Sequence, residues 1–491
     1  MRRRLRFLLG HKPVELDAID PTLTVLEWLR RVAFRRGAKE GCAEGDCGAC
    51  SVVVAEPEGG RLRYRAVDAC IRFMATLDGC QLLTVEDLKA PDGTLHPVQA
   101  ALVEHHGSQC GFCTPGFVMT LFALHAAGGE KPSRQRIDDA LAGNLCRCTG
   151  YGPIIEAVRR MHETPGAVAH LAEREAEVVA RLEAWRDGET LAIGEGGRTF
   201  YAPADLATLL ELAAGHTEAT ILAGATDVGL WVTKQRRRLD PVIWIGRVAE
   251  LATIEERDGA LSIGAGVTYA ETHARLEALW PDVGELIRRL GGEQIRAVGT
   301  IGGNIANGSP IGDSPPWLIA AGATLHLAHR DGRRSLPLED FFLAYGKQDL
   351  RPGEIVERVS VPLPEADSVL RCHKVSKRFD QDISAVCAAI WLRREGGRIA
   401  AARIAYGGMA ATPRRAREAE AALLGQPFAE ATFRRAMEAL VRDFQPIDDM
   451  RASAAYRLKV AQNLLLEVGL EAESPDGAPL RLAGRREPVH V

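Results

Sequence analysis

The distribution of cysteine limits this chain more than any other feature of its sequence. Nine of the eleven cysteines lie within the first 150 of 491 residues, and the other two are Cys372 and Cys387. In a reducing compartment, clustered cysteines indicate metal or redox chemistry rather than disulfides. The basic start at residues 1–10 has too short an apolar run for a signal peptide, and no later segment offers about 18 consecutive apolar residues. We therefore expect a cytoplasmic protein that does not span a membrane, and we disfavour a secreted disulfide module.

The first cysteine set is Cys42, Cys47, Cys50 and Cys70. Its spacing, Cys-x4-Cys-x2-Cys followed by a lone cysteine, is that of plant-type [2Fe–2S] ferredoxins. Four thiolates must surround two irons and two bridging sulfides, so the backbone has to wrap tightly around them. Neighbouring glycines permit this wrapping and let amide groups approach the sulfurs. Zinc is the alternative, but two close pairs would suit zinc better than a triplet and a single cysteine.

The second set is Cys110, Cys113, Cys146 and Cys148, in two close pairs. Each pair is expected beside a helix end, because Thr114-Pro115 can begin a helix and Gly143 can end one. In isolation this arrangement would also suit zinc. Its position directly behind a ferredoxin-like segment favours a second [2Fe–2S] cluster. The remaining thiols have no partner at ligand spacing and are expected to be small buried side chains: Cys80, Cys372 and Cys387.

Changes in sequence pattern predict an α+β multidomain protein. Alternating apolar residues on both sides of a turn near Gly10 predict a β-hairpin, and Thr24 with Glu27 predicts a capping box at a helix start. Two strands, a helix, a cysteine loop and a further strand are the layout of a β-grasp ferredoxin domain. The expected regions are a β-grasp ferredoxin domain at 1–78, a four-helix domain at 79–162, a linker at 163–195, an α/β domain at 196–368 and an α+β domain at 369–480. The linker is expected to hold at most a solvated helix, and the final domain is expected to contain a pair of strands followed by two helical stretches.

The charge balance is ordinary for a globular protein. The formal net charge is -4 and 26% of the residues are charged. Nucleic-acid binding and anionic membranes both call for a strongly basic surface. We therefore expect neither kind of partner.

Two glycine-rich turns in the later half could hold a phosphate group. Residues 221–227 predict a strand that runs into a helix, where backbone amides and the Thr226 hydroxyl could bind a pyrophosphate. Residues 300–304 precede a second loop, 307–313, that is rich in amide donors. The segment Gly264-Ala-Gly266 lacks the third glycine of a Rossmann fingerprint, so that fold is not predicted.

Three cysteine motifs together resemble the molybdenum hydroxylase family. They are Gly41-Cys-Ala-Glu-Gly-Asp-Cys-Gly-Ala-Cys50, Gln109-Cys-Gly-Phe-Cys-Thr-Pro-Gly116 and Gly143-Asn-Leu-Cys-Arg-Cys-Thr-Gly-Tyr151. The turns Gly224-Ala-Thr-Asp227 and Ile301-Gly-Gly-Asn304 resemble the FAD-binding segments of the same family. The resemblance extends from Leu5 to about Val468, and it implies two [2Fe–2S] clusters and one FAD.

The resemblance also implies roles for individual positions. Gln109 would approach the pterin of a molybdenum cofactor, Tyr345 would lie beside the isoalloxazine ring, and the loop 377–382 would affect access of NAD to the flavin. Leu290 and Val356 occupy apolar positions near the flavin in family members. The other expected FAD contacts are Thr220, Ile221, Leu222, Ala223, Gly224, Ala225, Thr226, Asp227, Thr300, Ile301, Gly302, Gly303, Asn304, Asp313 and Lys374.

Nothing in the sequence resembles the large molybdenum domain of this family, so hydroxylation is expected on a partner chain. The resemblance implies a subunit that passes electrons through its clusters to FAD and on to NAD, in an α2β2 heterotetramer. The fusion of iron–sulfur and FAD domains favours xanthine as the substrate, with an aldehyde or an aromatic N-heterocycle as alternatives. A stand-alone NADH diaphorase and a zinc-filled scaffold are the other possibilities.

Overall fold

The computed structural model describes residues 1–128, 131–166 and 168–473, and the chain divides into two compact units. The first unit comprises Met1–Leu251, Thr268–Ala270 and Gly291–Thr300. The second comprises Ala252–Val267, Glu271–Leu290 and the chain from Ile301 onward. The segment Gly291–Thr300 therefore packs with residues far earlier in the sequence.

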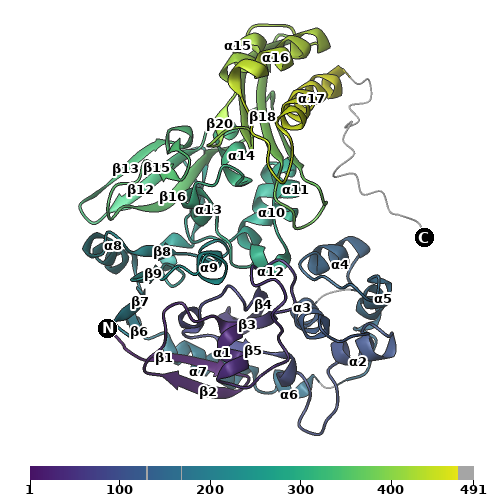
Figure 1. The fold of residues 1–491 in the computed structure, drawn as a ribbon, viewed down its shortest axis with the longest axis vertical. Coiled ribbons are helices and arrows are strands. Elements are labelled where there is room, and N and C mark those ends of the chain that lie inside the picture. The colour runs from purple at the N-terminus through teal and green to yellow at the C-terminus, as the bar shows by residue number, and fades with distance from the viewer. Residues whose placement is uncertain (129–130, 167, 474–491) are drawn as a thin grey trace. The chain divides into compact units, whose positions relative to one another are not determined.

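The first unit begins with a five-stranded sheet in the order β2-β1-β5-β3-β4 (Figure 1). Leu5 and Phe7 are fully buried in β1, and their alternation with Arg6 places one face of the predicted hairpin on the core. The strands are β1 (Leu5–Leu9), β2 (Lys12–Leu16), β3 (Ser51–Glu58), β4 (Arg61–Asp68) and β5 (Gln81–Leu83). Strand β5 lies between β1 and β3, so this sheet extends past the expected boundary at residue 78. A three-residue strand is too short to show a period in the sequence.

Helix α1 (Val25–Arg31) lies between the hairpin and the first cysteine loop in the sequence. The Thr24 hydroxyl caps it by accepting the N–H of Glu27. The Glu27 carboxylate does not complete the predicted capping box, because it pairs with Arg31 one turn later. The helix start was correctly predicted, and the second half of the box was not.

Helices dominate the described residues of the 84–162 segment. Ser133 caps α4 by accepting the N–H of Arg136. Phe117, Leu121 and Ile154 are buried in the core that these helices share. The helices are α2 (Pro97–Glu104), α3 (Thr114–Ala126), α4 (Arg134–Leu141) and α5 (Gly152–Arg160). The expected stop of α3 at Gly128-Gly129 lies partly outside the described residues.

The expected linker at 163–195 is more than a solvated connection. Val178, Val179 and Leu182 of α7 (Glu175–Trp185) are buried, and they form a small core with Leu8. These apolar residues stand at helical spacing between charged ones, a stripe too narrow to stand out in an alanine- and glutamate-rich segment. The segment also contains α6 (Ala169–Ala172) and β6 (Leu191–Glu195).

A second sheet completes the first unit, in the order β6-β7-β9-β8. Strands β7, β9 and β8 run parallel to one another, and β8 lies at one edge of the sheet. The carboxyl end of β8 leads into a turn and then into α9. The remaining elements are β7 (Arg198–Ala202), α8 (Leu206–Gly215), β8 (Thr220–Leu222), α9 (Val228–Thr233), β9 (Val242–Trp244) and α12 (Glu293–Arg296). Phe200 and Trp244 share one core cluster with Phe7 and Phe73, so both sheets belong to the same folded unit.

The second unit contains an antiparallel five-stranded sheet in the order β10-β11-β16-β12-β13. Its strands are β10 (Ile254–Arg257), β11 (Ala260–Gly264), β12 (Thr324–His329), β13 (Gly332–Pro337) and β16 (Ile355–Pro362), with a ribbon of β14 (Phe342–Ala344) and β15 (Lys347–Gln348). The helices that accompany this sheet are α10 (Tyr269–Leu279), α11 (Pro281–Arg288), α13 (Ile301–Asn307) and α14 (Ser314–Ala321).

A four-stranded antiparallel sheet with helices ends the second unit. Phe433, Leu440 and Leu465 are fully buried against the sheet residues Ile390 and Ile404. The elements are β17 (Ser368–Val375), β18 (Val386–Glu395), β19 (Arg398–Gly407), β20 (Arg414–Arg415), α15 (Arg417–Leu423), α16 (Glu430–Asp443) and α17 (Ala454–Glu473). The sequence predicts two helical stretches here, and the structure divides them into three helices.

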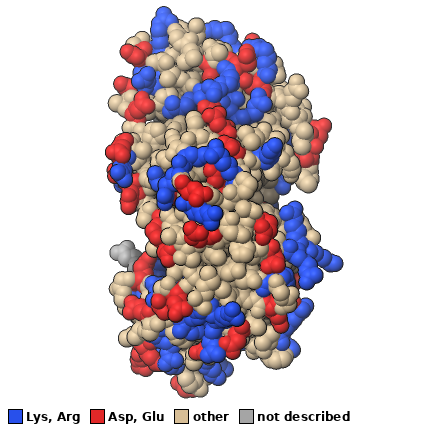
Figure 2. All heavy atoms as spheres, turned by 90° about the vertical axis from the view of Figure 1, so that its left-hand side faces the viewer, with Lys and Arg blue, Asp and Glu red and all other residues tan. Residues whose placement is uncertain are grey.

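The chain is thus α+β, with several sheets and helical regions. On the face shown in Figure 2, basic and acidic side chains are interspersed. None of the helices among the described residues is long and apolar enough to cross a membrane.

Candidate redox cofactor sites

The first cysteine set lies on the loop after α1 and at the end of β4, and hydrogen bonds join all four thiols. Contacts from Cys47 and Cys70 lower the pKa of the Cys42 thiol, and a further contact joins Cys50 to Cys70. The amide of Asp46 also donates to Cys42 Sγ at 3.3 Å. The structure therefore brings the predicted thiols together, with a backbone donor aimed at one sulfur.

Backbone conformations in this loop explain its glycines. Gly45 and Gly48 have φ angles of +76° and +67°, which favour glycine. A Cβ on Gly41 would lie 2.7 Å from Cys47 Sγ. The loop can therefore close around the thiols only with small residues at these points.

The second set is paired across its two motifs. Cys110 makes a thiol hydrogen bond with Cys148, and Cys113 makes one with Cys146. Burial, with the contact to Cys146, raises the pKa of Cys113 to about 12. Cys110 and Cys148 are exposed, whereas Cys113 and Cys146 are half-buried. One side of this thiol group therefore faces solvent.

The two cysteine sets meet through their backbones. The amide of Leu145, the residue before Cys146, donates to the carbonyl oxygen of Cys47 at 3.0 Å. A Cβ on Gly116 would lie 2.0 Å from the carbonyl oxygen of Gly48, which requires glycine at the start of α3. This close approach makes a short path between the sets.

Within the described ranges, no three His, Cys, Asp or Glu side chains are arranged around a single metal ion. Four thiols that contact one another, as in each of the two sets, are a donor set that a [2Fe–2S] cluster can take, with two sulfurs on each iron. Bound in these positions, the clusters would supply one-electron redox chemistry.

In the first unit, the expected FAD segment 220–227 consists of β8 and the strained turn that follows it. Ala225 has a φ of +62°, an uncommon conformation for a residue with a side chain. A Cβ on Gly224 would lie 1.9 Å from the carbonyl oxygen of Val298. In parallel sheets, ligands bind beyond the carboxyl ends of strands, where this turn lies. The Asp227 carboxylate already accepts the indole N–H of Trp231, at 3.0 Å.

Helix α9 connects this turn to the first cysteine loop. Thr233 Oγ1 donates to the carbonyl oxygen of Ala43 at 2.7 Å, and Lys234 Nζ donates to that of Cys42. Lys234 also forms an ion pair of 3.4 Å with Glu44. A Cβ on Gly229 would lie 2.6 Å from the carbonyl oxygen of Ile71, next to Cys70. The sequence gives no sign of these contacts, because they join segments about 150 to 190 positions apart.

In the second unit, Asp313 and Lys374 are buried together. Lys374 Nζ lies 2.6 Å from Asp313 Oδ2 and 2.9 Å from Ser384 Oγ, and Ser384 donates to Asp313 Oδ1. The structure thus joins two predicted residues and adds Ser384, which sequence reasoning missed. Asn304 Oδ1 is buried without a hydrogen-bond partner among the described residues, so it could accept a bond from a ligand.

The segment 300–304 is not the turn that was predicted. Residues Ile301–Asn307 form α13, and a Cβ on Gly302 would lie 2.4 Å from Cα of Ala265. Gly302 therefore serves the close packing of a helix beside the end of β11 rather than a loop conformation. Thr300 is counted with the first unit and Ile301 with the second, so the expected FAD residues are divided between the units.

The remaining predicted residues differ in accessibility. Tyr345 is 75% exposed and Val356 only 7% exposed, while Leu290 is half-buried and Gln109 is exposed. A cavity of about 270 Å³ lies elsewhere in the second unit, and none of its lining residues was predicted: His329, Asp331, Gly332, Arg333, Arg334, Arg351, Pro352 and Glu354.

Three family models match the chain. Residues 84–159 match a [2Fe-2S] binding domain, residues 194–364 an FAD binding domain in molybdopterin dehydrogenase, and residues 371–472 a CO dehydrogenase flavoprotein C-terminal domain. The chain therefore carries the domains of an iron–sulfur flavoprotein that acts as an oxidoreductase.

Whole-chain comparisons agree. A xanthine dehydrogenase of Emericella nidulans is 32% identical over 90% of this chain, and aldehyde oxidase 2 of Macaca fascicularis is 31% identical over 86%. The chain spans 36% of the length of each of these two relatives. The structure of quinoline 2-oxidoreductase from Pseudomonas putida 86 has 30% identity and a TM-score of 0.50, covering 55% of this chain and 95% of that one. The carbon monoxide dehydrogenase of Hydrogenophaga pseudoflava gives 29% identity and a TM-score of 0.52, covering 54% and 94%. The chain belongs to the molybdenum hydroxylase family.

Proposed function

We propose that this chain is the electron-transfer subunit of a NAD-dependent xanthine dehydrogenase. In this role it receives electrons that a partner's molybdenum centre takes from hypoxanthine or xanthine during purine catabolism, with urate as the product. The partner is a large molybdenum-cofactor subunit in an α2β2 heterotetramer, located in the cytoplasm. The observation that carries the proposal is the direct contact between two four-cysteine sets, through Leu145 and Cys47, in a chain with an FAD-binding domain.

The cysteines divide the relay into two steps. When bound, the two [2Fe–2S] clusters carry single electrons, and FAD collects two and reduces NAD. The second set presents Cys110 and Cys148 to solvent, so electrons from a partner enter on this side, beside the exposed Gln109. The first set, in a plant-type ferredoxin domain that ends near residue 84, lies against α9, the helix that follows the turn proposed for FAD. We further propose that the helical domain ends at residue 162, the linker at 195, the FAD-binding domain at 368 and the final domain at 480.

The proposed FAD contacts are held in place before the cofactor binds. The backbone of 220–227 is fixed by the close approach of Gly224 to Val298, and Lys374 by Asp313 and Ser384. Such pre-organisation reduces the entropy lost on binding. We also propose Lys374 and Asn304 as polar contacts to FAD, and Tyr345, Leu290 and Val356 as residues near its flavin ring. The loop 377–382 controls access of NAD.

The relay is tested on the complex purified from its native host. We expect iron, FAD and molybdenum in one preparation that reduces NAD with xanthine. A Cys148→Ser variant should keep FAD but lose xanthine-dependent NAD reduction, whereas Cys80→Ser, a change at a buried thiol outside both sets, should keep it. Unchanged turnover in Cys148→Ser would refute the relay.

An aldehyde or N-heterocycle hydroxylase is the second candidate, since aldehyde oxidase and quinoline 2-oxidoreductase are among the similar proteins. Molybdenum with no xanthine activity would favour it. A preparation with iron and FAD but no molybdenum would favour a stand-alone diaphorase.

A further inference from the structure

Gln294 is a buried amide at the junction of the two cysteine sets. It lies on α12, in the Gly291–Thr300 segment of the first unit, and its side chain is 1% exposed. Its Nε2 lies 2.8 Å from Asn144 Oδ1, 3.0 Å from Thr120 Oγ1 and 3.1 Å from Ser51 Oγ. One side chain therefore joins three segments that are distant in sequence.

Each of these partners belongs to a segment of the chain that carries candidate cluster ligands. Ser51 directly follows Cys50 of the first set. Asn144 precedes Cys146 of the second set by two positions, and Thr120 lies on α3, which begins directly after Cys113. Gln294 thus contacts both sides of the Cys47–Leu145 hydrogen bond.

The orientation of the amide follows from its neighbours. Asn144 Nδ2 donates to the carbonyl oxygen of Gly48 at 3.3 Å, which turns Asn144 Oδ1 toward Gln294 and requires an N–H there. Gln294 Oε1 has no hydrogen-bond partner among the residues described, and it lies 1.9 Å from where a Cβ on Gly143 would be. A buried acceptor without a partner is unfavourable. The contacts of Nε2, rather than those of Oε1, therefore define what Gln294 does at this position.

We propose that Gln294 is a positioning residue for electron transfer between the two clusters, an inference that rests on the proposed function. In this transfer the second cluster loses one electron and the first gains it, with no bond made or broken. Gln294 fixes the positions of Ser51 and Asn144 relative to each other. It thereby maintains the 3.0 Å hydrogen bond from the Leu145 N–H to the Cys47 carbonyl oxygen. Without the amide, this hydrogen bond opens more often and the coupling through it weakens.

The test compares Gln294→Met with Glu293→Gln in the full chain. Methionine keeps a similar length but removes the donors. Glu293→Gln alters the neighbouring position of α12 and removes its ion pair with Arg136, at 2.8 Å, while leaving the amide in place. Two measurements are made: amide hydrogen exchange in the peptide around Leu145, and freeze-quench EPR after mixing with less than one equivalent of dithionite.

We expect Gln294→Met to retain wild-type iron and FAD, to exchange the Leu145 amide about tenfold faster, and to pass electrons between the clusters about tenfold more slowly. Glu293→Gln should behave as the wild type. Thr120→Val removes a single acceptor, so it should change the exchange rate and the transfer rate in the same directions as Gln294→Met, but by smaller factors. If Gln294→Met does not fold, Thr120→Val tests the inference in its place.

Wild-type exchange and transfer rates in Gln294→Met would overturn the inference. Loss of iron from Gln294→Met and from Thr120→Val would also overturn it, because the role would then be purely structural. If the wild-type chain itself shows no pair of [2Fe–2S] signals, the proposed function fails, whatever the variants do.

Discussion

Lys234 places a positive charge beside the first cysteine loop, through its contact with the Cys42 carbonyl and its ion pair with Glu44. A nearby cation stabilises the reduced, more negative form of a cluster. We predict that Lys234→Gln makes the reduction potential of the first cluster more negative by about 20 to 40 mV, the size expected for a partly exposed charge. An EPR-monitored redox titration measures this. Lys131→Gln, which alters an exposed pair with Glu163, is the control and should leave the potential unchanged.

The sequence reveals the candidate cofactor ligands better than it reveals the residues that would position them. The grouping of the cysteines was predictable because each set stands at short spacings typical of metal ligands, and their role as ligands stays a prediction. Gln294, Lys234 and Ser384 were not predictable, because each contacts partners between 71 and 243 positions away, apart from the bond of Ser384 to Lys374. A single polar residue without a local pattern carries no signal of such contacts.

Helix α9 packs so closely on the segment after Cys70 that its Gly229 has no room for a side chain. We predict that Gly229→Ala destabilises the protein by about 1 to 3 kcal/mol, because the new methyl group meets backbone rather than a flexible side chain. Thermal unfolding of the loaded protein measures this. Gly215→Ala, at the end of α8, has open space around the added carbon and should cost nothing. Equal melting temperatures for the two variants would contradict the close packing.

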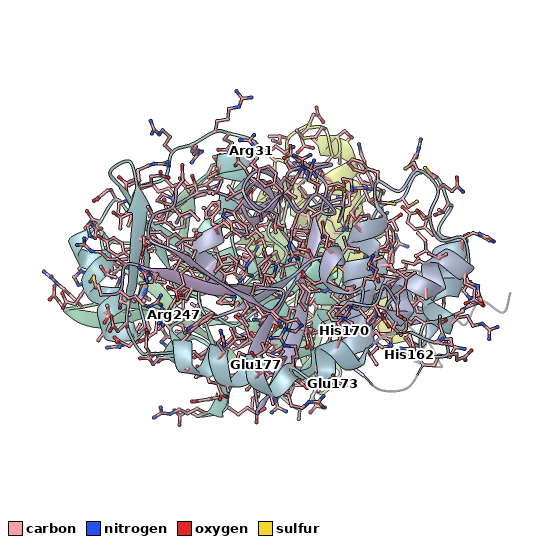
Figure 3. All side chains as sticks on the ribbon, turned by 90° about the horizontal axis from the view of Figure 1, so that it is seen from below. Arg31, His162, His170, Glu173, Glu177 and Arg247 are labelled. Carbon is pink, nitrogen blue, oxygen red and sulfur yellow. The ribbon has the colours of Figure 1, made fainter. Side chains whose placement is uncertain are left out.

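Helix α2 begins with a buried histidine. His96 caps the helix, and its ring lies 5.1 Å from that of His125, which stacks on His162 at 4.8 Å. Figure 3 labels His162, which follows α5, and His170, which lies in α6. Burial, with the nearby His125 and His170, lowers the pKa of His96 to about 3. The ring is therefore neutral in the folded protein.

The pKa of His96 makes stability depend on pH. Between about pH 6.5 and 3 the unfolded chain binds a proton that folded His96 does not, so stability falls as pH falls, by about 1.4 kcal/mol per pH unit well below 6.5. His96→Asn keeps a capping group without a titrating ring. We expect the variant to lose less stability than the wild type between pH 7 and pH 5 in urea unfolding. Parallel losses in the two proteins would contradict this account.

Element types were predicted better than the details that make sites. The hairpin, the capped start of α1 and the strand before the 223–227 turn follow from local patterns. Strand β5 and helix α7 were missed because a three-residue strand and a narrow apolar stripe have almost no periodicity. The glycines of 301–304 were misread as a turn because close helix packing and a loop require the same residue.

At the scale of the whole molecule, the family assignment and the two cysteine sets together indicate several redox centres within one polypeptide. The relatives are longer, and this chain spans 36 to 39% of the first three curated ones. Because the proposed function assigns the molybdenum chemistry to a partner chain, the purified chain by itself should not oxidise xanthine. Activity of the isolated chain toward xanthine would contradict that division of labour.

The central claim is that two [2Fe–2S] clusters and FAD occupy one chain, and metal analysis combined with EPR of the reduced, purified protein tests it most directly. The account predicts a red-brown protein with about four iron atoms and about one FAD per chain, and two distinct [2Fe–2S] signals. A Cys42→Ser variant should lose one signal and a Cys110→Ser variant the other. A colourless protein that contains zinc, or a single signal lost in both variants, would contradict it.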